Sequence, residues 1–146
     1  MKVFCDTNVL VAAFRQNHPQ HNAARPVLER IKAGKDTGFV AAHSLAEAYA
    51  VLTRLPGSER VAPTVSWQLI SKNVIDGFTL VQLTPKEYAQ TLEKAASDGV
   101  EGGTTYDALI LAAAAKSGAD RIYTFNLRHF QALAGSDLRE KLTAPS

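Results

Sequence analysis

The sequence contains very little cysteine, with only Cys5 among its 146 residues. One cysteine cannot form a disulfide within the chain, so the hydrophobic core and hydrogen bonds must hold the fold together. A chain without disulfides fits a reducing compartment, and we expect a cytoplasmic location. The length suits one domain with a core of useful size, so we expect a single domain over residues 1–146.

The chain also lacks a long hydrophobic run and a strong excess of charge of either sign. Its longest purely apolar stretch, residues 108–115, is far shorter than the ~20 residues that a membrane-spanning helix needs. We therefore expect no membrane partner. Asp6 and Asn8 interrupt the apolar start of the chain and no small-residue cleavage pattern follows, which argues against a signal peptide. The net charge of +2 is too weak to indicate a nucleic-acid partner by itself.

What is present is an alternation of short apolar segments with segments of helical period. Strands are predicted at residues 2–5, 38–41, 79–83 and 121–125. Helices are predicted at residues 7–14, 19–33, 45–55, 63–74 and 105–117. Two more are predicted, one that begins at Thr84 with a capping box and one that follows Asn126. Pro26 should kink or split the second of these helices. The alternation favours an α/β fold with a mostly parallel sheet.

Three carboxylates, Asp6, Glu47 and Asp107, each lie where a strand-like or loop segment passes into a helix. Asn126 occupies the same kind of place. In open parallel sheets the strand ends and helix starts meet at one edge, where ligands bind. We therefore expect these four residues to converge. Clustered carboxylates with one amide suit a hard divalent cation such as Mg²⁺ or Mn²⁺.

Helix capping is the competing explanation for each acid. Ser44 to Glu47 fits a capping box, Thr104 to Asp107 fits a weaker one, and Asp6 could cap the first helix. A helix needs only one polar cap, however, and Ser44 and Thr104 could supply it. Asp107 leads into an almost entirely apolar helix with no lysine or arginine close in sequence, so its charge needs a partner. Clustered carboxylates repel one another unless a cation is present, and the set as a whole favours a metal site.

The chain resembles the PIN-domain ribonucleases through four short motifs in the right order. These are DTNVL at residues 6–10, SLAE at 44–47, YDALI at 106–110, and TFN at 124–126 followed by Phe130. The similarity covers nearly the whole chain and is closest to the stand-alone VapC toxins of toxin–antitoxin pairs. It implies a PIN-like three-layer α/β/α sandwich around a mostly parallel sheet of four to five strands.

The resemblance also implies a function. It predicts an endoribonuclease that depends on Mg²⁺ or Mn²⁺, forms a homodimer and is inhibited by a small VapB-like antitoxin. It assigns Asp6, Glu47 and Asp107 as the catalytic, metal-binding acids. Asn126 departs from the pattern, because this position is often Asp in the family. Its amide oxygen can ligate a metal or a bound water without adding charge, or Asn126 can simply cap the last helix.

Several residues beside the motifs are candidates for contacting RNA or for orienting the acids: Thr7, Asn8, Thr124, Arg15, Arg128 and His129. Helix N-terminal amides near Thr7 and Asn8 could bind phosphate, and Thr124 could orient a carboxylate or water. Ordinary capping, strand or surface roles explain these residues equally well. His43 is predicted to be a core or edge residue.

Two other functions are compatible with parts of the sequence. The Asp6-Thr7-Asn8 start is similar to that of haloacid-dehalogenase-type phosphatases, whose nucleophile motif needs a second aspartate where Asn8 stands. The chain could also be a non-catalytic RNA-binding or protein-interaction module with a degenerate site. The three intact acids count against this second alternative.

Overall fold

Five strands form one sheet in which every neighbouring pair is parallel. The computed structural model describes all residues from 1 to 146. The strands are β1 (Lys2–Cys5), β2 (Thr37–Ala41), β3 (Phe78–Val81), β4 (Arg121–Tyr123) and β5 (Leu142–Thr143), in the order β3-β2-β1-β4-β5. The chain adds β2 and β3 on one side of β1 and then β4 and β5 on the other. The strand order therefore reverses at β1, the place where open α/β sheets form their binding crevice.

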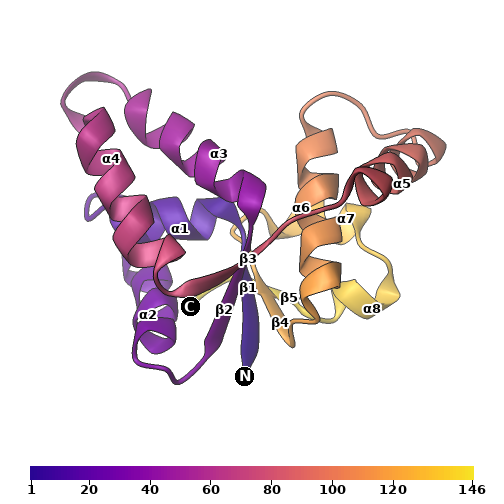
Figure 1. Cartoon of the computed structure of the whole chain (residues 1–146), viewed down its shortest axis with the longest axis horizontal. Helices are drawn as coiled ribbons and strands as arrows, with labels where there is room; N and C mark the ends of the chain where they lie inside the picture. Colours follow the sequence, from indigo (N-terminus) through magenta and orange to yellow (C-terminus); the bar gives the residue numbers. More distant parts are fainter.

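Eight α-helices surround this sheet. They are α1 (Thr7–Phe14), α2 (His21–Lys32), α3 (Ala42–Thr53), α4 (Pro63–Ile70), α5 (Pro85–Ser97), α6 (Thr104–Ser117), α7 (Leu127–Leu133) and α8 (Ser136–Arg139). Figure 1 shows α1 to α4 on one side of the sheet and α5 to α8 on the other. The predicted three-layer α/β/α sandwich is confirmed. No helix combines the length and the apolar character that crossing a bilayer requires.

The central strand is buried on both faces, as parallel strands between two helical layers usually are. Val3 and Cys5 pack with α1 and α2, whereas Phe4 points to the opposite face and packs with α6 and α7. Because side chains alternate along a strand, β1 is anchored in both cores at once. This rigid strand carries Asp6 at its carboxyl end.

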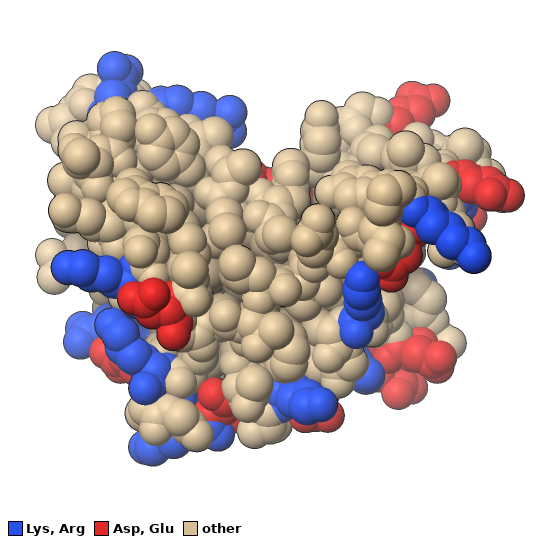
Figure 2. Space-filling view, viewed as in Figure 1, with Lys and Arg blue, Asp and Glu red and all other residues tan.

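A third, smaller core joins α1 to the hairpin formed by α3 and α4. It contains Val11, Ala48, Leu52 and Ile70. In Figure 1, α3 and α4 project beyond the sheet on one side, and α5 and the start of α6 project on the other. The surface is hollowed between these two projections (Figure 2). The hollow lies toward the carboxyl ends of the strands, because β1 runs toward it from the N-terminus.

Most predicted elements are present, and several have the predicted bounds. β1 and α1 begin and end as predicted, and α6 ends at Gly118 in the left-handed conformation. Thr84 and Glu87 form both hydrogen bonds of the predicted capping box. The predicted strands at residues 79–83 and 121–125 each run two residues too far.

Three predictions about helices and strands are corrected by the structure. Of the kink or split expected at Pro26, the split does not occur: α2 is one helix across Pro26, and Ala24, Val27 and Ile31 hold both halves in the core. The helix predicted at 63–74 is α-helical only to Ile70 and continues as a π-helical stretch, Ser71–Ile75. Two short elements, α8 and β5, were not predicted, since four and two residues carry too little periodicity to detect.

Candidate active site

Asp6 stands at the carboxyl end of β1, where the strand order reverses. Its backbone N–H donates to the Tyr123 carbonyl at 2.9 Å, which joins it to β4. Its side chain is only 5% exposed. The Thr7 N–H donates to Oδ1 at 2.7 Å and the Thr124 hydroxyl donates to Oδ2 at 2.8 Å. The protein thus holds both carboxylate oxygens in a defined orientation.

Buried hydroxyl groups extend this network to the neighbouring elements. Thr124 Oγ1 also accepts a hydrogen bond from the Asn126 N–H at 3.0 Å. The Thr7 hydroxyl donates to Ser44 Oγ at 2.8 Å, which links α1 to the first turn of α3. All three hydroxyl side chains are buried. Thr124 therefore orients Asp6, as the sequence suggested, whereas the Thr7 hydroxyl is engaged inside the protein.

Asn8 also makes a contact within the protein. Its Oδ1 accepts a hydrogen bond from the Phe125 N–H at 3.2 Å. This bond attaches α1 to the segment that follows β4. Asn8 thereby helps to position the turn that leads to Asn126.

Glu47 and Asp107 come to the same edge of the sheet from two different helices. α3 begins directly after β2, and Glu47 lies in its second turn. α6 leads back toward β4, so its first turn, which holds Asp107, lies at the carboxyl edge. The charges of both acids raise the pKa of Asp6, and Glu47 also raises the pKa of Asp107. The three carboxylates are therefore close enough at this edge for their charges to interact.

The pKa values reflect how unfavourable this negative charge is without a cation. Burial raises the pKa of Asp6 to about 7, the hydrogen bonds from Thr124 and Thr7 oppose the rise, and the nearby acids add to it. Burial is also the main cause of the raised pKa of Asp107, with Glu47 adding to it and His129 opposing it. A divalent cation would favour the ionised form of each acid.

The three acids do not form a closed ligand set in this structure. No group of three or more His, Cys, Asp or Glu side chains is drawn together as a metal cage. Glu47 lies instead with its Oε2 3.5 Å from His43 Nε2, four residues earlier on α3. The binding of one common ion by Asp6, Glu47 and Asp107 stays a prediction.

The family model of the PIN domain matches residues 3–136 of this chain. The chain belongs to the PIN domain family. It is 36% identical over 123 residues to ribonuclease VapC40 of Mycobacterium tuberculosis, an alignment that covers 84% of this chain and 85% of that protein. It is 31% identical over 115 residues to ribonuclease VapC27 of the same species, which covers 79% and 78% of the two chains.

Solved structures show the same fold at lower sequence identity. M. tuberculosis VapC20, a toxin that cleaves the sarcin–ricin loop, superposes with a TM-score of 0.69 at 19% identity, covering 89% of this chain and 94% of that one. A chain of Rickettsia felis VapBC2, crystallised with a promoter DNA fragment, gives a TM-score of 0.62 at 18% identity over the full length of both chains. At such identities the likeness is one of fold.

The PIN domain's acids are not explained by capping boxes. Ala41 and Gly103 occupy the N-cap positions of α3 and α6, and neither helix has a side-chain cap. The two capping boxes considered for Glu47 and Asp107 therefore do not form. Asp6 does cap α1 through the Thr7 N–H, so its structural role and its place in the site coincide.

Asn126 occupies the N-cap position of α7 but makes no side-chain cap there. Its Nδ2 lies 3.2 Å from His129 Nδ1 instead.

Arg128, in the first turn of the same helix, is exposed. Arg15 lies at the far end of α1, roughly 12 Å along the helix from its start, and its guanidinium pairs with Glu59 at 3.2 Å. Arg128 and His129 are thus better placed beside the acids than Arg15.

His43 and Tyr106 flank the acids, and the sequence did not single them out as a pair. Their rings are parallel within 2° with centroids 5.7 Å apart. His43 is partly exposed, at a helix start beside the site, and is not a core residue. The sequence indicates their closeness only indirectly, because each ring belongs to the first turn of a helix that carries one of the acids.

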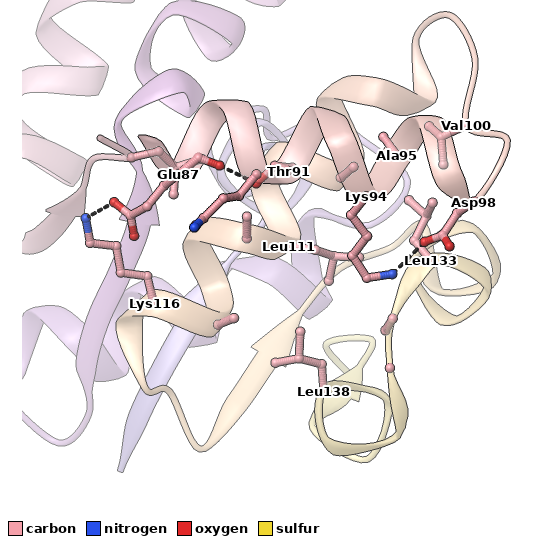
Figure 3. A pocket seen from close by; sticks show the side chains of 17 residues that line it. Glu87, Thr91, Lys94, Ala95, Asp98, Val100, Leu111, Lys116, Leu133 and Leu138 are labelled. Carbon is pink, nitrogen blue, oxygen red and sulfur yellow. Dashed lines mark hydrogen bonds and ion pairs between the residues drawn. The ribbon is translucent and has the colours of Figure 1, made fainter. Parts of the chain in front are cut away.

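An apolar cavity of about 470 Å³ lies elsewhere, between α5, α6 and the segment that joins α7 to α8 (Figure 3). Leu111, Leu133 and Leu138 line it, and the Lys116–Glu87 and Lys94–Asp98 ion pairs lie at its border. Neither Asp6, Glu47 nor Asp107 contributes to its lining. The cavity is therefore separate from the acids.

Replacing Asp6 should stabilise the metal-free protein at neutral pH. Because the folded-state pKa is near 7 and the ordinary value is 3.8, the folded state retains a proton that the unfolded state releases between these values. The free energy of unfolding should therefore fall as the pH rises from about 4 to 7. Asp6→Asn removes this loss, and we expect it to raise the free energy of unfolding at pH 8 by on the order of a few kcal/mol.

Urea denaturation in EDTA at pH 5 and pH 8 measures this effect. Asp76→Asn, at an exposed aspartate without an ion pair, is the matched control and should change stability little at either pH. A stability difference for Asp6→Asn that is the same at both pH values would show that the Asp6 carboxylate is not held in its protonated form.

Proposed function

We propose that this PIN domain is a metal-dependent endoribonuclease that acts as the toxin of a toxin–antitoxin pair. The observation that supports the proposal most is that Asp6 is buried at the switch point of the sheet and that the charges of Glu47 and Asp107, from two neighbouring helices, raise its pKa. The 36% identity to ribonuclease VapC40 over 84% of the chain supports the reaction and the biological role.

The residues at the site fit a hard divalent ion. Asp6, Glu47 and Asp107 supply carboxylate oxygens, the ligands that Mg²⁺ and Mn²⁺ prefer. Each Asp6 oxygen accepts one hydrogen bond, from the Thr7 N–H or the Thr124 hydroxyl, and a carboxylate oxygen can accept a second interaction. Asn126, whose N–H donates to the Thr124 hydroxyl oxygen, would contribute a neutral oxygen to the ion or to one of its waters.

A bound divalent ion would lower the pKa of the attacking water and polarise the scissile phosphate. The protein's own contribution is to position the reacting groups. Thr7 and Thr124 fix the orientation of Asp6, while Glu47 and Asp107 are partly exposed and reach the solvent side of the site. Arg128, in the first turn of α7, is exposed and can pair with an RNA phosphate.

The cleavage mechanism predicts the chemistry of the RNA ends. Attack by water does not involve the ribose 2′-hydroxyl, so the products should carry a 5′-phosphate and a 3′-hydroxyl. Cleavage should stop in EDTA and return with Mg²⁺ or Mn²⁺, and Asp6→Asn should lower kcat at least about a hundredfold, because a bound metal ion contributes several kcal/mol to the reaction. Mass spectrometry of the products and a metal titration measure both. Cleavage that persists in EDTA, or 2′,3′-cyclic phosphate ends, would contradict the mechanism.

The same experiment separates the alternative functions. A haloacid-dehalogenase-type phosphatase would release inorganic phosphate through a phospho-aspartate and would leave internal RNA bonds intact. The structure adds an argument against it, because Asn8 bonds to the Phe125 N–H and stands where that mechanism needs an acid. A non-catalytic RNA-binding module would bind RNA without cutting it at any metal concentration.

The neutral Asn126 should weaken metal binding in the absence of RNA. Three carboxylates hold less negative charge than four, so a second ion needs the charge of a substrate phosphate. We expect Asn126→Asp to tighten Mn²⁺ binding about tenfold by calorimetric titration, through one more charged ligand. Asn22→Asp, at an exposed position of α2, is the control and should leave the affinity unchanged. Tight binding of two ions by the unmodified protein would show that Asn126 does not limit metal binding.

In the proposed assembly, two copies of this chain form a homodimer and a small antitoxin binds to it. The structural relatives include VapBC2 of R. felis and FitAcB of Neisseria gonorrhoeae. Likeness to the VapC proteins supports a homodimer and a small antitoxin that binds this chain. The exposed apolar side chains Val65 and Trp67 on α4 offer contact surface for such partners.

Assembly and toxicity can be measured independently of the RNA sequence that is cut. Light scattering at high protein concentration should give twice the mass of one chain, since a homodimer is expected. Induction in bacteria should arrest growth, and the inactive Asp6→Asn variant should not. A mass of one chain at all concentrations would exclude the dimer, and normal growth despite full induction of active protein would exclude the toxin role.

A further inference from the structure

His43 and Tyr106 form a ring stack that joins the starts of two helices beside the proposed active site. Their rings are parallel within 2° at a centroid separation of 5.7 Å, a favourable offset arrangement. His43 lies in the first turn of α3, directly after β2, and Tyr106 lies in the first turn of α6. Both helix starts are at the edge of the sheet that carries Asp6.

The stack is immediately next to two of the three acids. The His43 Nε2 atom lies 3.5 Å from Glu47 Oε2, and Tyr106 directly precedes Asp107. A base that rests on these rings would therefore lie next to the helix starts that carry Glu47 and Asp107. None of the interactions described for the acids requires the aromatic ring of Tyr106.

Aromatic surface at this place remains open to solvent. Tyr106 is 55% exposed, although tyrosine rings are intermediate in their usual burial. A further exposed ring, Tyr88 on α5, lines with His43 a small hollow of about 30 Å³. His43, which stacks on Tyr106, therefore also borders a hollow that reaches the Tyr88 ring on α5. The bases of single-stranded RNA stack on exposed aromatic rings of this kind.

We propose that Tyr106, backed by His43, is a stacking platform for an unpaired base of the RNA next to the scissile phosphate. The inference rests on the proposed ribonuclease function and specifies its substrate class. A base can reach an exposed ring only if it is unstacked and unpaired, so the substrate is a single strand or a loop and not a continuous duplex.

A purely structural role for the stack makes different predictions. If the rings only held α3 and α6 together, their loss would displace Glu47 relative to Asp107 and lower kcat. A platform contributes to RNA binding, so its loss raises KM while the arrangement of the acids stays intact. Tyr106 is the sharper probe of the two, because His43 also contacts Glu47.

The test compares Tyr106→Leu and Tyr106→Trp with the unmodified protein on an unstructured oligoribonucleotide in Mg²⁺. We expect Tyr106→Leu to raise KM about tenfold with kcat within about twofold, from the usual loss of one base–aromatic contact. Tyr106→Trp, which offers a larger ring, should bind RNA at least as tightly as Tyr106. Tyr49→Leu, at another exposed tyrosine on α3, is the matched control and should leave KM unchanged.

An abasic nucleotide moved along the oligonucleotide locates the stacked base. At one position beside the cut, loss of the base should raise KM of the unmodified protein about tenfold but add little in Tyr106→Leu, because both changes remove the same contact. A binding readout without cleavage uses the Asp6→Asn variant and an oligonucleotide with 2-aminopurine at that position. Its fluorescence should be quenched on binding, and Tyr106→Leu in the same background should abolish the quenching.

The outcomes distinguish this inference from the proposed function. Cleavage by Tyr106→Leu with unchanged KM, or with a lowered kcat alone, would overturn the platform and leave the ribonuclease intact. Additive effects of Tyr106→Leu and the abasic nucleotide at every position would also overturn it. Failure of the unmodified protein to cleave any RNA in Mg²⁺ would overturn the function and the platform together.

Discussion

The burial of the Asp6 carboxylate is the interaction on which the site depends. A charged oxygen pair at 5% exposure is costly unless it is hydrogen-bonded, and the protein supplies donors from Thr7 and Thr124. These bonds offset only part of the cost, since the pKa of Asp6 remains about 7. The fold thus retains an unfavourable group in a fixed orientation, which is the usual condition of a residue kept for function rather than for stability.

The rest of the architecture holds this group in place. β1 is anchored by apolar side chains on both faces, so its carboxyl end has little freedom to move. The reversal of strand order at β1 leaves space above that end, and β4 closes one side through the Asp6–Tyr123 backbone bond. The Thr7–Ser44 bond then attaches α3, so that Glu47 is brought to the same place by a buried polar contact. Helix α6 adds Asp107 because its path toward β4 begins at this edge.

Predictions made from neighbouring residues were correct where the hydrogen bonds join residues close together in the sequence. The Thr84–Glu87 capping box formed because both of its hydrogen bonds lie within four residues. The same reasoning failed at Ser44, which matches a capping box by spacing but is fully buried against Thr7. The split considered at Pro26 also does not occur, because tertiary packing keeps α2 continuous. In each failure a contact with a residue distant in the chain outweighed the local preference.

The sequence by itself determined the class of fold, the order of the elements and the acids at their junctions, because hydrophobic periodicity and strand-to-helix transitions are properties of neighbouring residues. Only the tertiary structure decided which groups meet. Thr124 bonds to Asp6 across 118 positions, Asn8 bonds to the Phe125 N–H across 117, and His43 stacks on Tyr106 from another helix. Such contacts depend on strand order and helix placement, which no local pattern encodes.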